Sequence, residues 1–181
     1  MTIATAEDVL AFWRAAGEQK WFDKDDAFDA EIRQRFLPTY EAAAGGAFSD
    51  WEATPDGALA LLIVLDQFPR NMFRRDPRTF AADAAARAVA DRALARGFDR
   101  QVPEGERLFF YLPFEHSEAM ADQDRCCALF RALGNADQLH WAELHADIIR
   151  RFGRFPHRNA SLGRTTTPEE KAFLDSDGFA G

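Results

Sequence analysis

Most of the chain consists of segments in which apolar residues recur every three or four positions, separated by short polar connections. Side chains at this spacing share one face of an α-helix, so each segment predicts a helix with one buried stripe. Capping residues, prolines and glycines mark where the segments begin and end. We expect helices between Thr5 and Gly17, Asp23 or Asp25 and Gly45, Thr54 and Pro69, Asp76 and Gly97, Pro113 and Gly134, and Asn135 or Asp137 and Gly153, with shorter ones after Pro103 and Thr167.

Two of these segments contain a proline that affects the helix. Pro38 lies inside a stripe that repeats every four residues from Phe28 to Tyr40, and it should kink that helix or split off its last turn. The segment after Thr54 is apolar on nearly every side, so we expect it to be the most buried helix. We also expect this helix to end at Pro69, because proline interrupts the backbone bonding of a helix.

The composition favours an all-α fold. The chain has 33 Ala but only nine Val plus Ile, and alanine favours helices whereas β-branched residues favour strands. Its 181 residues suit a single domain that spans residues 1–181. Because short connections make neighbouring helices antiparallel, we predict about seven or eight helices stacked as antiparallel hairpins. A repeat of about 34 residues, typical of a common class of helical-repeat protein, is not found in the sequence.

Charge and hydropathy restrict the partners and the compartment. The chain has 30 acidic and 22 basic residues and a net charge of −8, which is unsuited to binding a nucleic-acid backbone. The longest apolar run, Ala58–Leu65, is shorter than the roughly 18 residues that a membrane span requires. Because the N-terminal segment lacks the basic start of a secretion signal, and the adjacent Cys126 and Cys127 cannot form a long-range disulfide, we expect a cytoplasmic protein.

Three segments carry more polar side chains than helix packing requires. Residues 65–74 surround a proline-bearing helix end, where Asp66 can pair with Arg70 one turn on. Polar residues follow a dense aromatic run in residues 109–118, and residues 145–164 contain five arginines and two histidines against one acid. The candidate site residues are Arg70 and Asn71 in the first segment, Glu115, His116 and Glu118 in the second, and His145, Arg154, His157 and Arg158 in the third.

The leading hypothesis is a polar cleft that binds a small carboxylate or phosphate. Acids of the second segment and bases of the third would neutralise each other if the two segments pack together, since buried charges need partners. Arg70, Arg154 and Arg158 would then hold the anion, because a guanidinium binds such groups bidentately. Asn71 would orient the ligand, and His157 would contact it.

Proton transfer in this cleft would involve the second segment. The helix expected after residue 113 places Glu115 and Glu118 in its first turns, where they form one acidic stripe with Asp122. His116 would then lie near a helix N-terminus, whose dipole favours a neutral imidazole that acts as a general base with Glu115 or Glu118. His145 lies on an inward-facing stripe, where a histidine is either a satisfied core residue or part of the site.

Two alternatives assign the same segments to other roles. In the first, the polar groups are structural ion pairs that only lock the helices in register. In the second, the chain is a protein- or peptide-binding module, and exposed aromatic residues on a concave face would support that reading. Burial of Trp13, Trp21, Trp51 and Phe80 would count against the second alternative.

The sequence contains no recognisable metal or cofactor motif. It lacks the paired Glu-x-x-His motifs of di-iron bundles, the cysteine-rich sites of zinc proteins and the glycine-rich loops that bind nucleotides. We therefore expect neither a metal nor a cofactor. The candidate residues suit either an enzyme or a binding protein, so the sequence predicts no particular reaction, and it predicts no oligomeric state.

Five motifs, in order along nearly the whole chain, resemble one bacterial family. The motifs are Asp8 to Trp13 (DVLAFW), Trp21-Phe22, Leu65 to Asn71 (LDQFPRN), Tyr111 to Glu118 (YLPFEHSE) and Phe152 to Asn159 (FGRFPHRN). The chain is thereby similar to the family called domain of unknown function 924, although Arg14 stands where that pattern has another aromatic residue. The resemblance implies an all-α fold similar to tetratricopeptide-repeat-like helical hairpins. It implies no activity, because none is assigned to the family.

Overall fold

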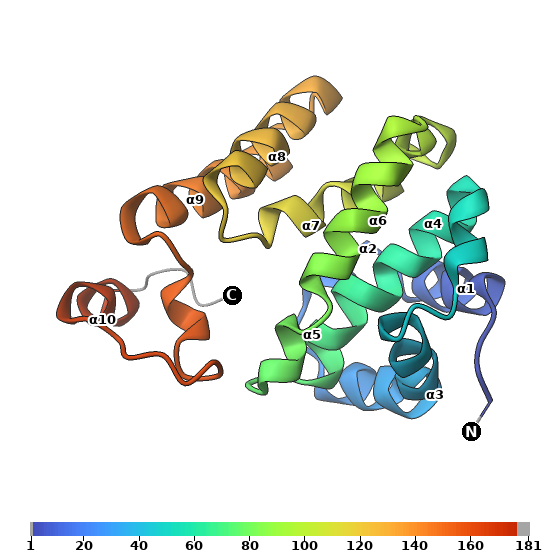
Figure 1. The fold of residues 1–181 in the computed structure, drawn as a ribbon, viewed down its shortest axis with the longest axis horizontal. Coiled ribbons are helices and arrows are strands. Elements are labelled where there is room, and N and C mark those ends of the chain that lie inside the picture. Colours follow the sequence, from blue (N-terminus) through green and yellow to red (C-terminus); the bar gives the residue numbers. More distant parts are fainter. Residues whose placement is uncertain (1, 177–181) are drawn as a thin grey trace. The chain divides into compact units, whose positions relative to one another are not determined.

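The structure, a computed structural model, describes residues 2–176. Every regular element in those residues is an α-helix, a 3₁₀ turn or a π-turn, so the predicted all-α class is confirmed (Figure 1). The α-helices are α1 (Ala6–Ala16), α2 (Glu18–Phe22), α3 (Asp26–Ala44), α4 (Pro55–Leu62), α5 (Phe68–Met72), α6 (Asp83–Ala95), α7 (Leu112–Glu115), α8 (Met120–Leu133), α9 (Ala136–Phe152) and α10 (Pro168–Asp175). The 3₁₀ turns are Ser49–Ala53, Pro77–Phe80, Phe98–Gln101, Glu104–Phe110 and Pro156–Arg158. None of the described helices is both long and apolar enough to cross a membrane.

Several of these helices are single turns. Helices α2, α5 and α7 contain five, five and four residues. Because of these short helices, the described residues contain more α-helices than the about seven or eight expected from the sequence pattern. Trp21 and Phe22, which lie between the first two helices expected from the sequence, are the last residues of α2.

The predicted helix boundaries are confirmed where a capping side chain defines them. Thr5 and Thr167 each accept a hydrogen bond of 3.2 Å from the backbone N–H three residues on, and both complete a capping box. Asn135 caps α9 by accepting a 3.0 Å hydrogen bond from the backbone N–H of Gln138. Gly153 ends α9 with a φ of 68°, which residues with a side chain rarely adopt. The sequence predicts these helix ends because each depends on residues that lie only a few positions apart in the chain.

The described chain divides into two compact units. The first comprises residues 2–74 and 78–113, and the second comprises residues 75–77 and 114–176. The single domain expected from the chain length is not tested by this division and stays a prediction.

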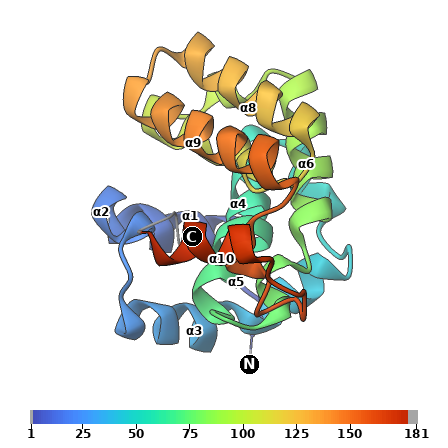
Figure 2. The same cartoon turned by 90° about the vertical axis from the view of Figure 1, so that its left-hand side faces the viewer.

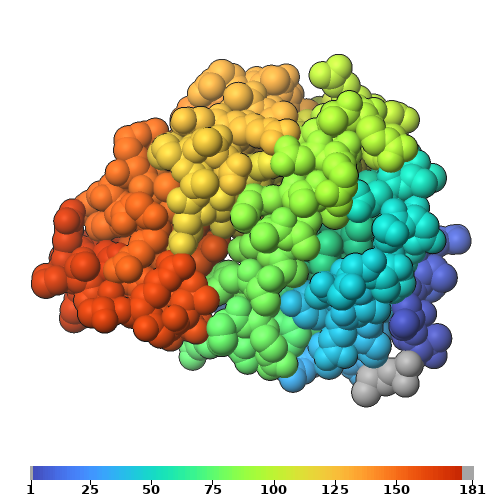
Figure 3. All heavy atoms as spheres, viewed as in Figure 1, coloured from blue at the N-terminus to red at the C-terminus, as the bar shows by residue number. Residues whose placement is uncertain are grey.

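An aromatic cluster forms the core of the first unit. The ring of Phe68 in α5 lies 4.8 Å from that of Phe36 in α3 and 5.7 Å from that of Trp13 in α1, measured between centroids. Helix α4 packs against α1 and α6, and Leu59 and Leu62 in it are fully buried. This burial confirms the prediction for the segment after Thr54. In the space-filling view, the blue to green atoms of this unit form one continuous packed body (Figure 3).

The helix that α4 begins does not end at Pro69, as the sequence suggested. It continues through a π-turn, Ile63–Gln67, into α5. The backbone N–H of Phe68 donates to the carbonyl of Ile63, five residues earlier, instead of four. The wider turn fits Pro69 because proline has no N–H to donate and its ring would clash with the carbonyl one turn back. Proline here is therefore accommodated within a helical run rather than terminating it.

The structure changes two further expectations about proline. Helix α3 runs unbroken from Asp26 to Ala44, so Pro38 does not split off its last turn, and the kink expected as the alternative stays a prediction. Phe36 and Tyr40, on either side of Pro38, are both buried, and their packing holds the helix together across the missing backbone bond. Pro77 opens only a 3₁₀ turn, and α6 starts later, at Asp83.

The second unit is built on a hairpin of α8 and α9. Gly134, with a φ of 78°, ends α8, and α9 returns beside it (Figures 1 and 2). Ile148 and Ile149 of α9 pack with Phe155, which follows the helix, in a buried cluster. Helix α10 packs against the Pro156–Arg158 turn. The hairpin agrees with the antiparallel arrangement predicted, and the likeness to tetratricopeptide repeats stays a prediction.

Candidate functional site

The connection between α7 and α8 corrects the helix start expected at Glu115 and Glu118. Helix α7 ends at Glu115, and α8 begins after Glu118, so the acidic stripe predicted to include Asp122 is wrong. The buried side-chain amide of Gln123 explains the break. It donates to the backbone carbonyls of Glu115, at 2.7 Å, and Ser117, at 2.6 Å. These two carbonyls are thus satisfied without a continuous helix through the segment.

His116 consequently follows the C-terminal end of a four-residue helix rather than an N-terminus. The prediction that a helix dipole keeps its imidazole neutral is therefore wrong, because the dipole has the opposite sign at this end. The carbonyl of His116 instead accepts a 2.9 Å hydrogen bond from Nη2 of Arg158. His116 thus contacts Arg158 through its backbone carbonyl.

The turns that follow α9 pack against this connection, as the sequence analysis predicted. Besides the Arg158 bond to His116, Oε1 of Glu118 accepts a 2.9 Å hydrogen bond from the backbone N–H of Phe155. Arg158 is 6% exposed, and its guanidinium carbon lies 4.5 Å from the centroid of the Phe155 ring. The second and third polar segments therefore meet within the second unit.

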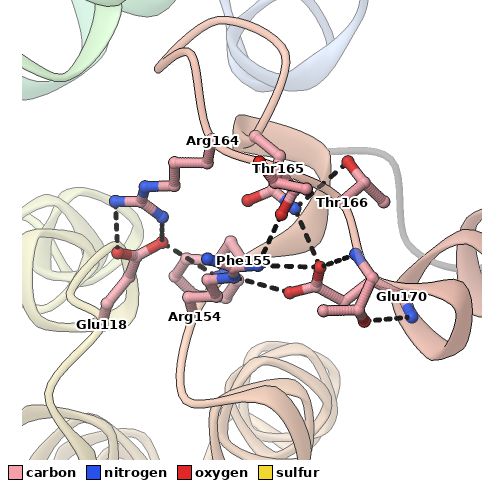
Figure 4. A network of polar contacts seen from close by, with 9 residues as sticks. Glu118, Arg154, Phe155, Arg164, Thr165, Thr166 and Glu170 are labelled. Atoms are coloured by element: carbon pink, nitrogen blue, oxygen red, sulfur yellow. Dashed lines mark hydrogen bonds and ion pairs between the residues drawn. The ribbon is translucent and has the colours of Figure 1, made fainter.

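Glu118 forms the first of two bidentate ion pairs in this unit. Both of its carboxylate oxygens accept 2.8 Å hydrogen bonds from Arg164, whose guanidinium faces it squarely (Figure 4). Burial opposes ionisation most strongly, yet the hydrogen bonds from Arg164 and from the Phe155 N–H, with the charge of Arg158, lower the pKa of Glu118 below its usual value. Glu118 is therefore an ionised, fully engaged carboxylate at neutral pH.

Glu170 of α10 forms the second pair, with Arg154. Oε1 accepts a 2.6 Å bond from Nε of Arg154, and Oε2 accepts bonds from Nη2 of Arg154 (2.9 Å), the Asn159 amide (3.1 Å) and the Thr167 N–H (2.7 Å). Figure 4 shows Glu170 facing Arg154 within this network. The hydrogen bonds from Arg154 and Thr167 lower the pKa of Glu170 from 4.5 to about 2. Arg154 also donates to the Thr165 carbonyl at 2.9 Å.

Arg154, a predicted ligand contact, is thus engaged in holding the chain together. Its Nε and Nη2 groups join the end of α9 to α10 and to the loop before it. A guanidinium whose charge is neutralised by a carboxylate attracts a further anion less strongly. The structural ion pairs of the first alternative are therefore present at Arg154 and Arg164.

Glu115 and His145 form a third polar group, and both residues are buried. Nδ1 of His145 lies 3.5 Å from Oε1 of Glu115 and 2.8 Å from the Trp141 carbonyl. The thiol of Cys126 lies 3.9 Å from Oε2 of Glu115. Burial and the nearby carboxylate raise the pKa of Cys126, so this buried cysteine is an inert thiol at neutral pH. His145 is therefore buried with a hydrogen-bond partner, which agrees with the first of the two predictions for it, and its part in a site stays a prediction.

His157 lies on the Pro156–Arg158 turn. Its ring centroid is 5.5 Å from that of Phe155. Burial, followed by the charges of Arg158 and His145, lowers the pKa of His157 to about 3. His157 is therefore neutral over the physiological range, where it can donate or accept a hydrogen bond but adds no charge.

The candidates of the first polar segment, Arg70 and Asn71, belong to the first unit. Arg70 pairs with the fully buried Asp66 one turn back, at 3.3 Å, as expected, and with Asp83 at 3.1 Å. The Asn71 amide donates to Asp29 at 2.7 Å. Both side chains thus stabilise the region of the π-turn, and their roles as ligand contacts stay predictions.

The residues that sequence reasoning missed are the acceptors of the basic block. Glu170 was not among the candidate residues, and Asn159 appeared only within a motif. The signal that could have found Glu170 is the charge imbalance of residues 145–164, since five arginines with one acid require carboxylates from neighbouring elements. In the described residues, no three His, Cys, Asp or Glu side chains form a group that could hold a metal ion.

The four aromatic residues whose burial would count against peptide binding differ in their exposure to solvent. Trp13 is 1% exposed, whereas Trp21, Trp51 and Phe80 are partly exposed. The four residues are therefore not all buried, and peptide binding stays a prediction.

With this geometry established, the chain can be compared with known proteins. The model of a family described as "Bacterial protein of unknown function (DUF924)" matches residues 9–178. The chain belongs to this family. The membership agrees with the resemblance of the five sequence motifs, and a search of curated proteins gave no match.

A solved structure supports the fold of this DUF924 protein. The structure of a protein of unknown function, ATU0120 from Agrobacterium tumefaciens, is similar with a TM-score of 0.92 and 49% sequence identity. The match covers 94% of this chain and 97% of that one. The two proteins therefore share one fold over nearly their whole lengths.

Proposed function

We propose that the second unit binds a small carboxylate or phosphate beside His116, His157 and Arg158. The observation that carries the proposal is the hydrogen bond from Arg158 to the His116 carbonyl, which brings the second and third polar segments together. A guanidinium presents a planar fork that matches carboxylate and phosphate oxygens. At 6% exposure, Arg158 also lies where a charge interaction is weakly screened by water.

The neighbouring ion pairs define which groups contribute to this site. Arg154 and Arg164 are neutralised by Glu170 and Glu118, so in the proposal they hold the turns in place. Glu118, held ionised by Arg164, positions the Phe155 backbone rather than moving a proton. In the proposal, Arg158 supplies the planar donor fork beside the His116 carbonyl, and the neutral His157 supplies a hydrogen bond.

The experiment is a thermal-shift screen of the protein against phosphorylated and carboxylated metabolites, with inorganic phosphate included. A ligand at a hundred times its Kd adds about 2.7 kcal/mol of stability, which is a readily measured shift in Tm. Arg158→Lys retains the charge but removes the fork, so we expect it to reduce the affinity of any hit at least about tenfold. The matched control is Arg131→Lys, because Arg131 is exposed and pairs only at the surface with Glu143 within the described part of the chain.

Two results would contradict the proposal. One is a panel in which no anion raises the Tm of the wild-type protein. The other is a hit whose affinity is the same in Arg158→Lys as in the wild type. The Arg131→Lys control should retain the wild-type affinity.

A further inference from the structure

A buried carboxylate–imidazole pair lies in the second unit and involves no residue of the two structural ion pairs. Nδ1 of His145 is 3.5 Å from Glu115 and 2.8 Å from the carbonyl of Trp141. The His145 and Glu115 side chains are 9% and 6% exposed. Because a charge removed from water needs a partner, a pair at this depth has a strong mutual influence on its protons.

These contacts determine which nitrogen of the His145 ring carries the proton. A backbone carbonyl can only accept a hydrogen bond, so Nδ1 donates to Trp141, and Nε2 carries the lone pair in the neutral ring. The carboxylate of Glu115, next to the same Nδ1–H, favours the imidazolium that forms when Nε2 takes a proton. Orientation and stabilisation of an imidazole by a carboxylate at Nδ1 is the arrangement used by histidine general bases.

The pair lies beside the groups proposed to bind the anion. The ring of Phe155 has its centroid 5.6 Å from that of His145 and 5.5 Å from that of His157, and it lies 4.5 Å from the Arg158 guanidinium carbon. The titratable and charged groups near the pair include His157 and Arg158 from the turn, His116 and Glu118 from the connection before α8, and the Cys126 thiol from α8, which contacts Glu115. The ring of Phe155 connects the three basic side chains.

We propose that His145, positioned by Glu115, is the proton acceptor of this site, in place of His116. When an anion that carries a hydroxyl group binds, Nε2 forms an N–H bond as the O–H bond breaks, and the electron pair of that bond stays on the oxygen. The resulting imidazolium is neutralised by Glu115. This inference depends on the proposed function only for the identity of the ligand. The tautomer and the pairing follow from contacts within the second unit.

The test is a nitrogen-15 NMR titration of the side chains of the four histidines. In the wild type we expect the proton of neutral His145 on Nδ1. In Glu115→Gln we expect the pKa of His145 to fall by about one unit or more, because the opposite charge is lost. Glu143→Gln, an exposed change on the same helix, and the signal of the exposed His140 serve as controls and should not change. Inorganic phosphate should then raise the pKa of His145 and leave that of His140 unchanged.

The outcomes separate this inference from the proposed function. A proton on Nε2 of neutral His145 in the wild type, or an unchanged titration in folded Glu115→Gln, overturns the proton-acceptor role whatever the binding result. If Glu115→Gln does not fold, the wild-type tautomer still decides. The predicted tautomer together with a phosphate-insensitive His145, and no anion found in the thermal-shift screen, preserves the pair and overturns the anion site.

Discussion

Arg154 and Arg158 lie four residues apart in one loop, but their contacts differ, and we propose different roles for them. Arg154 donates to both oxygens of Glu170, whereas Arg158 donates to a backbone carbonyl and lies over the Phe155 ring. An anion gains little from a guanidinium that a carboxylate already neutralises. The two arginines are equivalent in the sequence pattern, and the pairing of Arg154 with Glu170 depends on the position of α10.

The Arg154–Glu170 pair makes a prediction about stability. Glu170→Gln removes the charge with little change in size, and we expect it to lower the free energy of unfolding at neutral pH by about 1.5–3 kcal/mol. The control is Glu169→Gln, because the neighbouring Glu169 is 66% exposed and pairs with Arg151 at the surface. That change should have an effect below about 1 kcal/mol. Urea denaturation of the two variants compares them directly.

The same pair makes a prediction about pH. The pKa of Glu170 is lowered from 4.5 to about 2 in the folded protein, so its contribution is complete above the unfolded value and is lost as the pH falls from about 4.5 towards 2. Wild-type stability should therefore decrease in this window more steeply than that of Glu170→Gln. Parallel curves for the two proteins, measured by urea denaturation at each pH, would show that Glu170 is not held ionised by its partners.

At the scale of elements, two interruptions of helices place polar groups. The π-turn Ile63–Gln67 accommodates Pro69 and carries the fully buried Asp66. The break between α7 and α8 presents the carbonyl of His116 to Arg158. In a continuous helix the backbone carbonyls would have accepted backbone hydrogen bonds, and fewer of them would have been available to side-chain donors. The irregular segments are therefore the ones that bring the polar side chains together.

Gln123 is the residue on which the second interruption depends. Replacement by Met keeps the volume but removes the amide that donates to Glu115 and Ser117. We expect Gln123→Met to lower the free energy of unfolding by about 1–3 kcal/mol, because buried carbonyls lose their partner. Gln138→Met, on a partly exposed position of α9, should change it by less than about 0.5 kcal/mol. Equal stability of the two variants would contradict this role for Gln123.

For the whole molecule, the sequence predicted what depends on local chemistry. The all-α class follows from alanine content and apolar spacing, and the ends at Thr5, Asn135 and Thr167 follow from caps that act over three residues. The break after Glu115 could not be predicted, because it depends on an amide in the next helix. The π-turn is likewise set by packing around Pro69 rather than by the residue alone.

The candidate site shows the same division between local and distant determinants. The meeting of the second and third polar segments was predicted from complementary charge, and the contacts of Glu118 and Arg158 agree with it. The partner of each arginine was not predictable, because Glu170 reaches Arg154 from a helix outside the basic block. The tautomer of His145 likewise depends on Trp141 and Glu115, which come from different elements.

The central claim is that an anion binds beside His116 and Arg158, and an amide chemical-shift map tests it most directly. The anion that raises the Tm most is titrated into nitrogen-15-labelled wild-type protein. The account predicts that the largest saturable shifts fall in residues 115–118 and 155–158. Shifts confined to residues of α1 to α3, or the same shifts in Arg158→Lys at the same anion concentrations, would contradict it.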